Sequence, residues 1–211
     1  MKEKKLQRTL GIDFNFSDTD ALPAFVDSMI EAHGLPDGLA HLALASSTGK
    51  TLEQLEAGEI QKTFNLALTP TILLCRQLAG KMKGRGSGSI VLFSSMFGIV
   101  APDPRIYPES LTSNPIDYGA AKAAILQLSR YLAVHYGPDG IRFNCVTPGP
   151  FPDLKKYTGS PQFLTDLCNK TALRRTGINT EIVGPTLFLL SEGASFVTGH
   201  SLVVDGGWTA W

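Results

Sequence analysis

The stretch IDYGAAKAAILQLSRYLAVHYGPDGIRFNCVTPG, residues 116–149, decides the fold. Residues 116–136 predict a helix, on which Tyr118 and Lys122 are four positions apart and therefore share one face. The strand predicted over 140–149 follows directly. Small residues surround the Tyr-Lys pair, which favours a helix that packs very closely on its neighbours: Gly119, Ala120, Ala121, Ala123 and Ala124.

Outward from this stretch, short apolar runs alternate with longer helical patterns. The runs predict further strands over 9–16, 38–45, 88–95 and 200–207, and the helical patterns cover 18–33, 58–82 and 180–193. The helix over 58–82 is expected to bend near Pro70. Strands that are apolar on both faces and alternate with helices predict one α/β domain over residues 1–211, a doubly wound, Rossmann-like parallel sheet between two helix layers.

Composition limits the partners that the chain can have. Its 211 residues are 43% hydrophobic and 18% charged, which suits a single globular domain. The 19 basic and 19 acidic side chains cancel, so we expect a small-molecule partner and neither nucleic acid nor a membrane surface. The sequence shows no signal peptide and no run of apolar residues long enough to span a membrane, which predicts a cytoplasmic protein.

The three cysteines are far apart in the sequence. Cys75, Cys145 and Cys168 show neither a C-x-x-C pair nor the spacing of a zinc site, so no metal site is predicted and the thiols are interpreted as reduced.

Tyr118 and Lys122 together are a candidate catalytic pair. An ammonium group close to a phenol favours the phenolate and lowers the phenol pKa from about 10, which makes a general acid or base usable near neutral pH. A pair on the protein surface is the alternative for any Y-x-x-x-K pattern. Ser94 and Ser95 support the catalytic reading, because they end the predicted strand before this helix and place hydroxyl groups at the carboxyl edge of the sheet.

Three glycine-rich stretches were weighed as ligand sites. SSTGKT, residues 46–51, falls short of a phosphate-binding loop because Leu44 stands where the first glycine is needed. GRGSGS, residues 84–89, precedes a strand and is interpreted as a turn. PGPFP, residues 148–152, leaves the carboxyl end of a strand, where open α/β sheets bind ligands.

Four motifs in order resemble the short-chain dehydrogenase/reductase family, from about residue 13 to the C-terminus. They are SSMFG (94–98), YGAAK (118–122), NCVTPG (144–149) and TGHSLVVDGG (198–207). The resemblance implies that Tyr118 is the acid/base, that Lys122 holds the nicotinamide ribose and tunes Tyr118, and that Ser95 hydrogen-bonds the reacting oxygen. It also implies that Asn65 holds a water molecule in the proton relay.

The same resemblance implies NAD or NADP as the cofactor and hydride transfer to or from a carbinol carbon. Asp13 matches the residue at the adenine ring, with an aspartate in an N-terminal turn as the alternative, and Pro148 and Gly149 match the loop at the cofactor. The segment between Gly98 and Tyr118 is longer than usual and looks like that of a subgroup linked to sugar biosynthesis. A sugar-like substrate is therefore expected, with Arg105 and Tyr107 as contacts, although Arg105 in solvent or paired with an acid is the alternative.

The sequence also departs from the family pattern. It begins where the family has its third strand, so the first β-α-β unit and its glycine loop are lacking, and His41, Leu42 and Leu44 replace two asparagines and a glycine. The strand predicted over 9–16 then lacks its family partners. It either pairs in parallel with 38–45, or that edge of the sheet is disordered or filled by another chain.

Two classes of function follow. The first is an oxidoreductase that acts on a hydroxyl or carbonyl group of a small substrate; the second is a non-catalytic binding or oligomerisation subunit, or a gene fragment that has lost the dinucleotide site. The C-terminal tail with Trp208 and Trp211 suits contacts in a homo-oligomer, a dimer or tetramer, or alternatively packs on its own core. The substrate, the choice between NAD and NADP, and the direction of reaction stay open.

Overall fold

Four strands form one parallel sheet. The computed structural model describes residues 10–42, 47, 49–157 and 159–211. The strands are β1 (Gly38–His41), β2 (Gly88–Phe93), β3 (Ile141–Pro148) and β4 (Ser201–Val204), and they lie in the order β1-β2-β3-β4 with parallel pairing throughout. The predicted α/β fold class is confirmed, because helices make each crossover between the strands.

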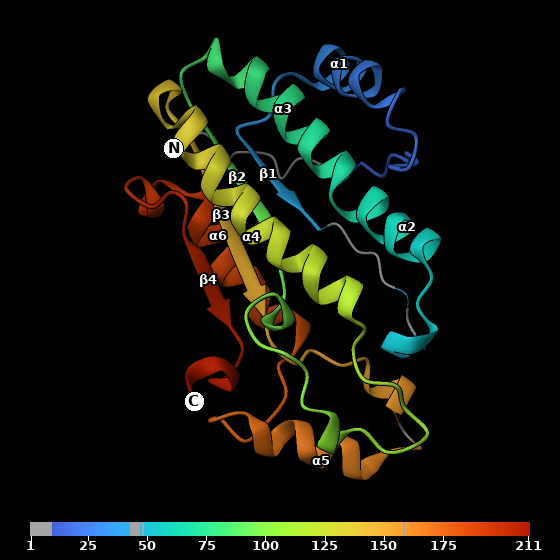
Figure 1. Ribbon diagram of the computed structural model, residues 1–211. Coiled ribbons are helices and arrows are strands. Elements are labelled where there is room, and N and C mark those ends of the chain that lie inside the picture. Colours follow the sequence, from blue (N-terminus) through green and yellow to red (C-terminus); the bar gives the residue numbers. More distant parts are fainter. Residues whose placement is uncertain (1–9, 43–46, 48, 158) are drawn as a thin grey trace.

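Helices cover both faces of the sheet (Figure 1). On one face α3 (Thr69–Lys83) and α4 (Ile116–Tyr136) pack on Ile90, Leu92 and Phe143. On the other face α6 (Val183–Leu190) packs on Val91 and Phe93 through Leu189. Alternate residues of β2 thus serve opposite faces, which explains why its sequence is apolar throughout.

The predicted helix over 58–82 is two helices. α2 (Ala57–Ala67) ends before Leu68, and α3 begins one residue later with Pro70 in its first turn. Proline has no N–H to donate, and the first turn of a helix is where this loss is tolerated. The bend near Pro70 is therefore confirmed as a break. The turn predicted in GRGSGS is also present, with Gly86 at a φ of 73° just before β2.

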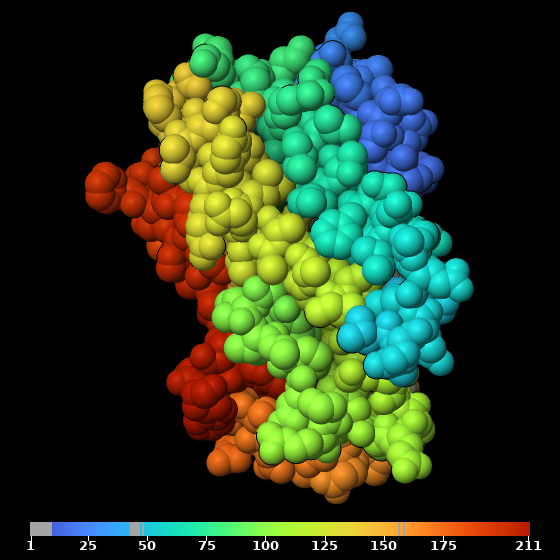
Figure 2. Space-filling view, viewed as in Figure 1, coloured from blue at the N-terminus to red at the C-terminus, as the bar shows by residue number. Residues whose placement is uncertain are grey.

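One helix was missed by the sequence interpretation. α5 (Pro161–Lys170) lies beyond the carboxyl ends of the strands (Figure 1). Its sequence signals are Pro161 at the first position and Phe163 and Leu167 four residues apart, each 5% exposed. In Figure 2 the green segment before α4 lies beside the orange α5 region, and Ile106 of this segment packs on Phe163 and Leu167.

The strand predicted over 9–16 is wrong, because residues 10–16 form no strand. Phe14 instead stacks on Phe25 of α1 (Leu22–His33) with ring centroids 4.1 Å apart, and the Phe16 ring lies 5.7 Å from that of His41. Packing therefore covers part of Phe14 without pairing to β1, while Leu10 and Ile12 stay 61% and 45% exposed. That another chain fills this edge stays a prediction. Residues 43–46 and 48, including Leu44 and part of SSTGKT, lie outside the described residues.

Gly98 lets the loop after β2 approach the backbone of α4. A Cβ atom on Gly98 would lie 2.7 Å from Ser94 Oγ, 2.9 Å from the carbonyl carbon of Lys122 and 3.0 Å from Ala123 N. We expect Gly98→Ala to lower the free energy of unfolding by about 2–3 kcal/mol, because a backbone contact cannot yield as a side chain would. Urea denaturation measures the change.

A matched control for this substitution is Gly80→Ala in the exposed part of α3, where no atom lies within 4 Å of the added Cβ. This change should stabilise the helix by roughly 0.5–1 kcal/mol, because alanine has the higher helix propensity. Similar unfolding midpoints for the two variants would contradict the close approach at Gly98.

Candidate active site

Ser95 and Tyr118 meet at the carboxyl end of β2. β2 ends at Phe93, and the two serines that follow are held by α4, since Ser94 Oγ donates to the Lys122 carbonyl oxygen at 2.8 Å. Tyr118 lies in the first turn of α4, where its hydroxyl hydrogen-bonds the side chain of Ser95. The sequence hypothesis that these two side chains lie together is therefore consistent with the geometry.

Lys122 lies one turn further along the same face of α4. Its side chain is buried, with the residue 4% exposed, and Nζ donates to the Phe93 carbonyl oxygen at 3.0 Å. Nζ is also 5.7 Å from the centroid of the Tyr118 ring, within the range of a cation–π contact. The structure thus brings Ser95, Tyr118 and Lys122 to one point beside the end of β2.

Burial dominates the titration of this group. It lowers the pKa of Lys122 to about 8, and it raises the pKa of Tyr118, although the hydrogen bond to Ser95 acts in the opposite direction. The expectation that Lys122 lowers the pKa of Tyr118 is wrong for this structure. The physical reason is that both side chains leave water, and the desolvation penalty falls on the phenolate as well as on the ammonium. Tyr118 therefore holds its proton at neutral pH.

A cavity of about 370 Å³ opens next to Tyr118 and Ser95. It lies between the ends of the strands and α5, which is the place where open parallel sheets bind ligands. Tyr107 of the long segment before α4 lines it, as sequence analysis predicted for this residue, and so does Gly149. Other aromatic residues around it are Phe97, Phe151, Tyr157 and Phe163.

Four predicted site residues do not line this cavity: Asn65, Asp13, Pro148 and Arg105. Asn65 is exposed on α2, because that helix turns Thr63 and Ala67 inward and leaves the position between them outside. Asp13 is exposed in the irregular segment before α1.

Arg105 is the clearest correction among these residues. Its guanidinium makes a 2.8 Å ion pair with Asp103, and its side chain is 84% exposed. The alternative of an arginine paired with an acid is the one that the structure shows, and Arg105 is not among the residues that line the cavity.

Gly149 has a packing role. A Cβ atom there would lie 2.4 Å from the Cα of Asp205, so only glycine lets the loop after β3 cross the end of β4. Asp205 in turn accepts hydrogen bonds from Gly207 N and Thr209 N, both at 2.8 Å. These hydrogen bonds place Asp205 in the turn formed by D-G-G, residues 205–207.

Asp117 is a buried residue that sequence analysis did not select. It is 2% exposed and accepts hydrogen bonds from Ser47 N at 3.1 Å, Ser47 Oγ at 2.6 Å and Thr63 Oγ1 at 2.5 Å. Burial alone would raise the pKa of Asp117, but these hydrogen bonds outweigh it and the pKa is lowered. The available signal was an acidic residue in the first turn of a helix, next to Tyr118.

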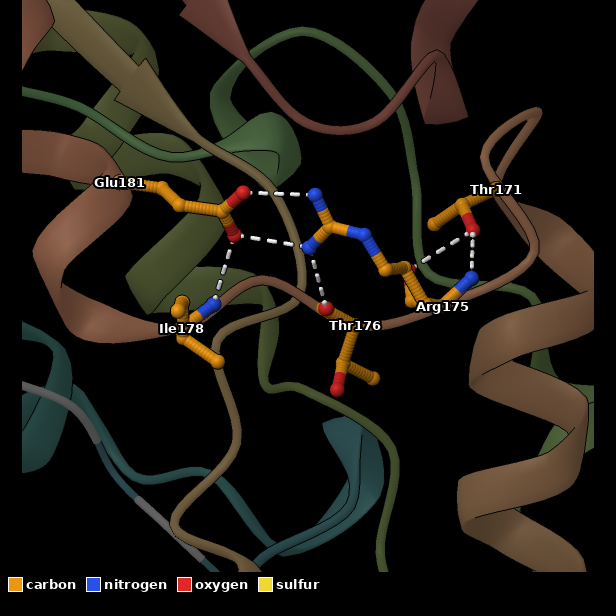
Figure 3. Close-up of polar contacts among 5 residues, drawn as sticks. All are labelled: Thr171, Arg175, Thr176, Ile178 and Glu181. Carbon is orange, nitrogen blue, oxygen red and sulfur yellow. Dashed lines mark hydrogen bonds and ion pairs between the residues drawn. The ribbon is translucent and has the colours of Figure 1, made fainter.

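Hydrogen bonds and an ion pair hold the chain after α5 in place (Figure 3). Arg175 and Glu181 form a two-pronged ion pair with distances of 2.6 and 2.8 Å. Thr171, fully buried, accepts from Arg175 N at 3.1 Å, and Leu173 N donates to Gly206 O at 3.1 Å. These contacts hold α5, one wall of the cavity, against the end of the sheet.

Within residues 10–42, 47, 49–157 and 159–211, no three His, Cys, Asp or Glu side chains are grouped so as to hold a metal ion. Nor does any helix in those ranges have the length and apolar character needed to cross a membrane.

Comparison with known proteins places this geometry in a family. The family model described as Enoyl-(Acyl carrier protein) reductase matches residues 2–209. Cis-4-hydroxycyclohexanecarboxylate dehydrogenase of Sinomonas cyclohexanicum is 31% identical over 204 residues, which cover 96% of this chain and 78% of that protein. The NAD-dependent glycerol dehydrogenase of Listeria innocua is 28% identical over 203 residues, 96% of this chain and 76% of that protein.

A solved structure shows the same fold. The short chain dehydrogenase from Leptospira borgpetersenii, determined with bound NAD+, superimposes with a TM-score of 0.84 at 30% identity, over 94% of this chain and 74% of that one. The match of the family model to nearly the whole chain agrees with the grouping of Ser95, Tyr118 and Lys122. The chain belongs to the short-chain dehydrogenase/reductase family of oxidoreductases.

Proposed function

We propose that the protein is an NAD(P)-dependent oxidoreductase that interconverts a hydroxyl and a carbonyl group on a small substrate. The observation that carries this proposal is the hydroxyl of Tyr118, which hydrogen-bonds Ser95 at a cavity while the buried Lys122 lies 5.7 Å from its ring. The names of the Sinomonas and Listeria relatives, both dehydrogenases, support the same class of reaction. A sugar-like, hydroxylated substrate is part of this proposal.

The residues present fit the nicotinamide half of such a cofactor. A nicotinamide dinucleotide supplies the hydride donor or acceptor for the carbinol carbon. The hydroxyl of Tyr118 and the ammonium of Lys122 are the groups that would hold the ribose next to the nicotinamide, with Gly149 across the cavity. Asp13, which the family resemblance assigns to the adenine, lies away from this cavity. The described residues around the cavity therefore fit only the nicotinamide half of the cofactor.

In this proposal Tyr118 moves the proton and Ser95 orients the reacting oxygen. During reduction the protonated phenol of Tyr118 gives its proton to the carbonyl oxygen, and during oxidation the same atom receives the proton of the substrate hydroxyl. The hydroxyl of Ser95 donates to the reacting oxygen and fixes its position next to the phenol. The wall formed by α5 and Phe151 keeps bulk water from this side of the cavity.

We also propose a homo-oligomer, a dimer or a tetramer. Exposed apolar side chains lie on α4, where Tyr131 is 65% and Val134 80% exposed, and on α6, where Leu187 is 59% exposed. In the C-terminal tail Trp208 is buried in its own core at 5% exposure, which leaves Trp211, at 71%, as the tryptophan available for a partner. A monomeric mass in light scattering would contradict this part of the proposal.

Titration with NADH and NADPH, followed by fluorescence, tests the proposed function. We expect one of them to bind with a dissociation constant below about 1 mM, and the same cofactor to support oxidation or reduction within a panel of small alcohols and ketones. Arg105→Ala is a matched control, because Arg105 is exposed and paired away from the cavity, and should bind the cofactor as the wild type does. Absence of binding at millimolar concentrations of both cofactors would leave the non-catalytic subunit.

A further inference from the structure

The cavity next to Tyr118 is walled by uncharged side chains. Among the described residues that line it, none is acidic or basic. Three cations near the cavity have partners of their own: Arg105 pairs with Asp103, Lys170 Nζ donates to the same carboxylate at 3.1 Å, and Lys122 Nζ donates to the Phe93 carbonyl oxygen at 3.0 Å. Moving an anion from water into such a site is costly without a paired charge. The walls therefore disfavour a substrate that carries a carboxylate or a phosphate.

One wall of the cavity is aromatic. The rings of Tyr107 and Tyr157 each lie 5.2 Å from the ring of Phe163, which is itself 5% exposed. Together with Phe97 and Phe151 they present apolar ring faces and edges to the cavity. Its volume of about 370 Å³ is at the lower end of the range for small-molecule sites, which suits a compact ring rather than a long chain.

A second part of the lining is polar but neutral. It consists of Thr112, Ser113 and Asn114. The backbone of Asn114 hydrogen-bonds the Tyr107 hydroxyl, which ties the two walls together. The buried side-chain oxygen of Asn114 has no hydrogen-bond partner among the described groups. A buried acceptor without a donor costs about 1–3 kcal/mol, so a donor that arrives with the ligand would be favoured.

We propose that the substrate is an uncharged ring alcohol that carries a second hydroxyl group. Its reacting hydroxyl lies at Tyr118 and Ser95, its ring contacts the aromatic wall, and its second hydroxyl donates to Asn114 Oδ1. Asn114 is then a specificity residue. This inference rests on the proposed function, because it places the reacting oxygen at Tyr118.

Three substituted cyclohexanols test the inference: cis-cyclohexane-1,4-diol and 4-methylcyclohexanol, which match in size, and the larger anion cis-4-hydroxycyclohexanecarboxylate. Their kcat/KM values are compared with the cofactor that binds. We expect the diol to exceed the methyl compound about tenfold, because one hydrogen bond is gained. It should exceed the carboxylate by about a hundredfold or more, because the anion has no partner in the cavity.

Asn114→Ala should reduce the preference for the diol over the methyl compound to within about twofold, because the acceptor is removed. The methyl compound is the internal reference, because the ratio of the two kcat/KM values cancels any loss that both substrates share, and thermal unfolding checks that the variant folds. Asn114→Ser is a second, smaller change with the same expectation. Equal or faster turnover of the carboxylate in the wild type overturns the inference, and so does an undiminished preference for the diol in both variants.

Binding measured without cofactor separates this inference from the proposed function. Saturation-transfer NMR on the purified chain ranks the same three compounds by affinity. A preference for the diol that depends on Asn114, in a protein that binds neither NADH nor NADPH, would refute the oxidoreductase and keep the description of the cavity. Binding of none of the three, or strongest binding of the carboxylate, overturns the inference itself.

Discussion

Tyr118→Phe is expected to lower kcat by about a thousandfold and to leave the fold intact. The substitution removes one oxygen atom, the group that hydrogen-bonds Ser95 at the cavity, and keeps the ring that lies near Lys122. General acid–base catalysis typically contributes about 10²–10⁴ to the rate, so loss of the phenol should fall within that range. Steady-state kinetics in both directions measures the change, and thermal unfolding confirms the fold.

The matched control is Tyr107→Phe. Tyr107 lines the same cavity and also loses only a hydroxyl, but its hydrogen bond runs to the backbone of Asn114 rather than to Ser95. We expect less than a tenfold change in kcat, because a single neutral hydrogen bond contributes about 1 kcal/mol. Equal losses of kcat in the two variants would show that removing either hydroxyl group from the cavity has the same effect. That result would contradict the role of Tyr118 as the acid/base.

The pH dependence follows from the direction in which the pKa of Tyr118 is shifted. Burial raises it above the ordinary tyrosine value, so the protonated phenol persists through neutral pH. Reduction requires that proton and should therefore hold its rate until the pH exceeds about 10. A decline of the reduction rate between about pH 6 and 8 that disappears in Tyr118→Phe would contradict this shift.

The sheet and α4 were predictable, because the apolar residues that they bury follow a regular pattern in the sequence. Helices cover both faces of β2 and β3, so the apolar runs of these segments indicate buried strands. α4 was predicted with its observed bounds, residues 116–136. Ser95 and Tyr118 follow from this, since a strand end and the next helix start share one edge of a parallel sheet. The edge of the sheet is different. Phe14 and Phe16 alternate as in a strand, yet the half-buried Phe14 stacks on Phe25 of α1, and Phe16, 37% exposed, lies beside the His41 ring without strand pairing.

Other parts of the site depend on what side chains do in three dimensions. Sequence spacing placed Lys122 near Tyr118, but it did not show that burial would outweigh the charge of the ammonium. Asn65 shares a motif with the family, yet its exposure depends on which face α2 turns toward α4. Asp117 accepts hydrogen bonds from two residues that lie 54 and 70 positions away in the sequence, and no local sequence pattern predicts such contacts.

Lys122→Met is expected to abolish turnover and, at neutral pH, to stabilise the fold. Burial lowers the pKa of Lys122 from 10.5 to about 8, which corresponds to a penalty of roughly 3 kcal/mol on the charged form. Methionine fills a similar volume without a charge, and the hydrogen bond that it loses to the Phe93 carbonyl oxygen is worth about 1 kcal/mol. The free energy of unfolding at pH 7 should therefore rise by about 2 kcal/mol.

The gain in stability should shrink at high pH. Below pH 8 the wild-type ammonium is charged in both the folded and the unfolded chain, so the whole penalty is present. Between about pH 8 and 10.5 the folded chain binds fewer protons than the unfolded one, and the wild-type stability rises with pH. Urea unfolding of the wild type and of Lys122→Met at pH 7 and pH 10 measures this difference.

Lys81→Met is the matched control for this pH dependence. Lys81 is 48% exposed and pairs with Asp27 at 2.9 Å, so its replacement should change the stability by less than about 1 kcal/mol at pH 7. If Lys122→Met instead destabilised the protein at pH 7, Lys122 would be a structural residue that binds the end of β2. A loss of turnover together with a gain in stability would mean that the chain keeps a buried charge beside Tyr118 that its fold alone would not favour.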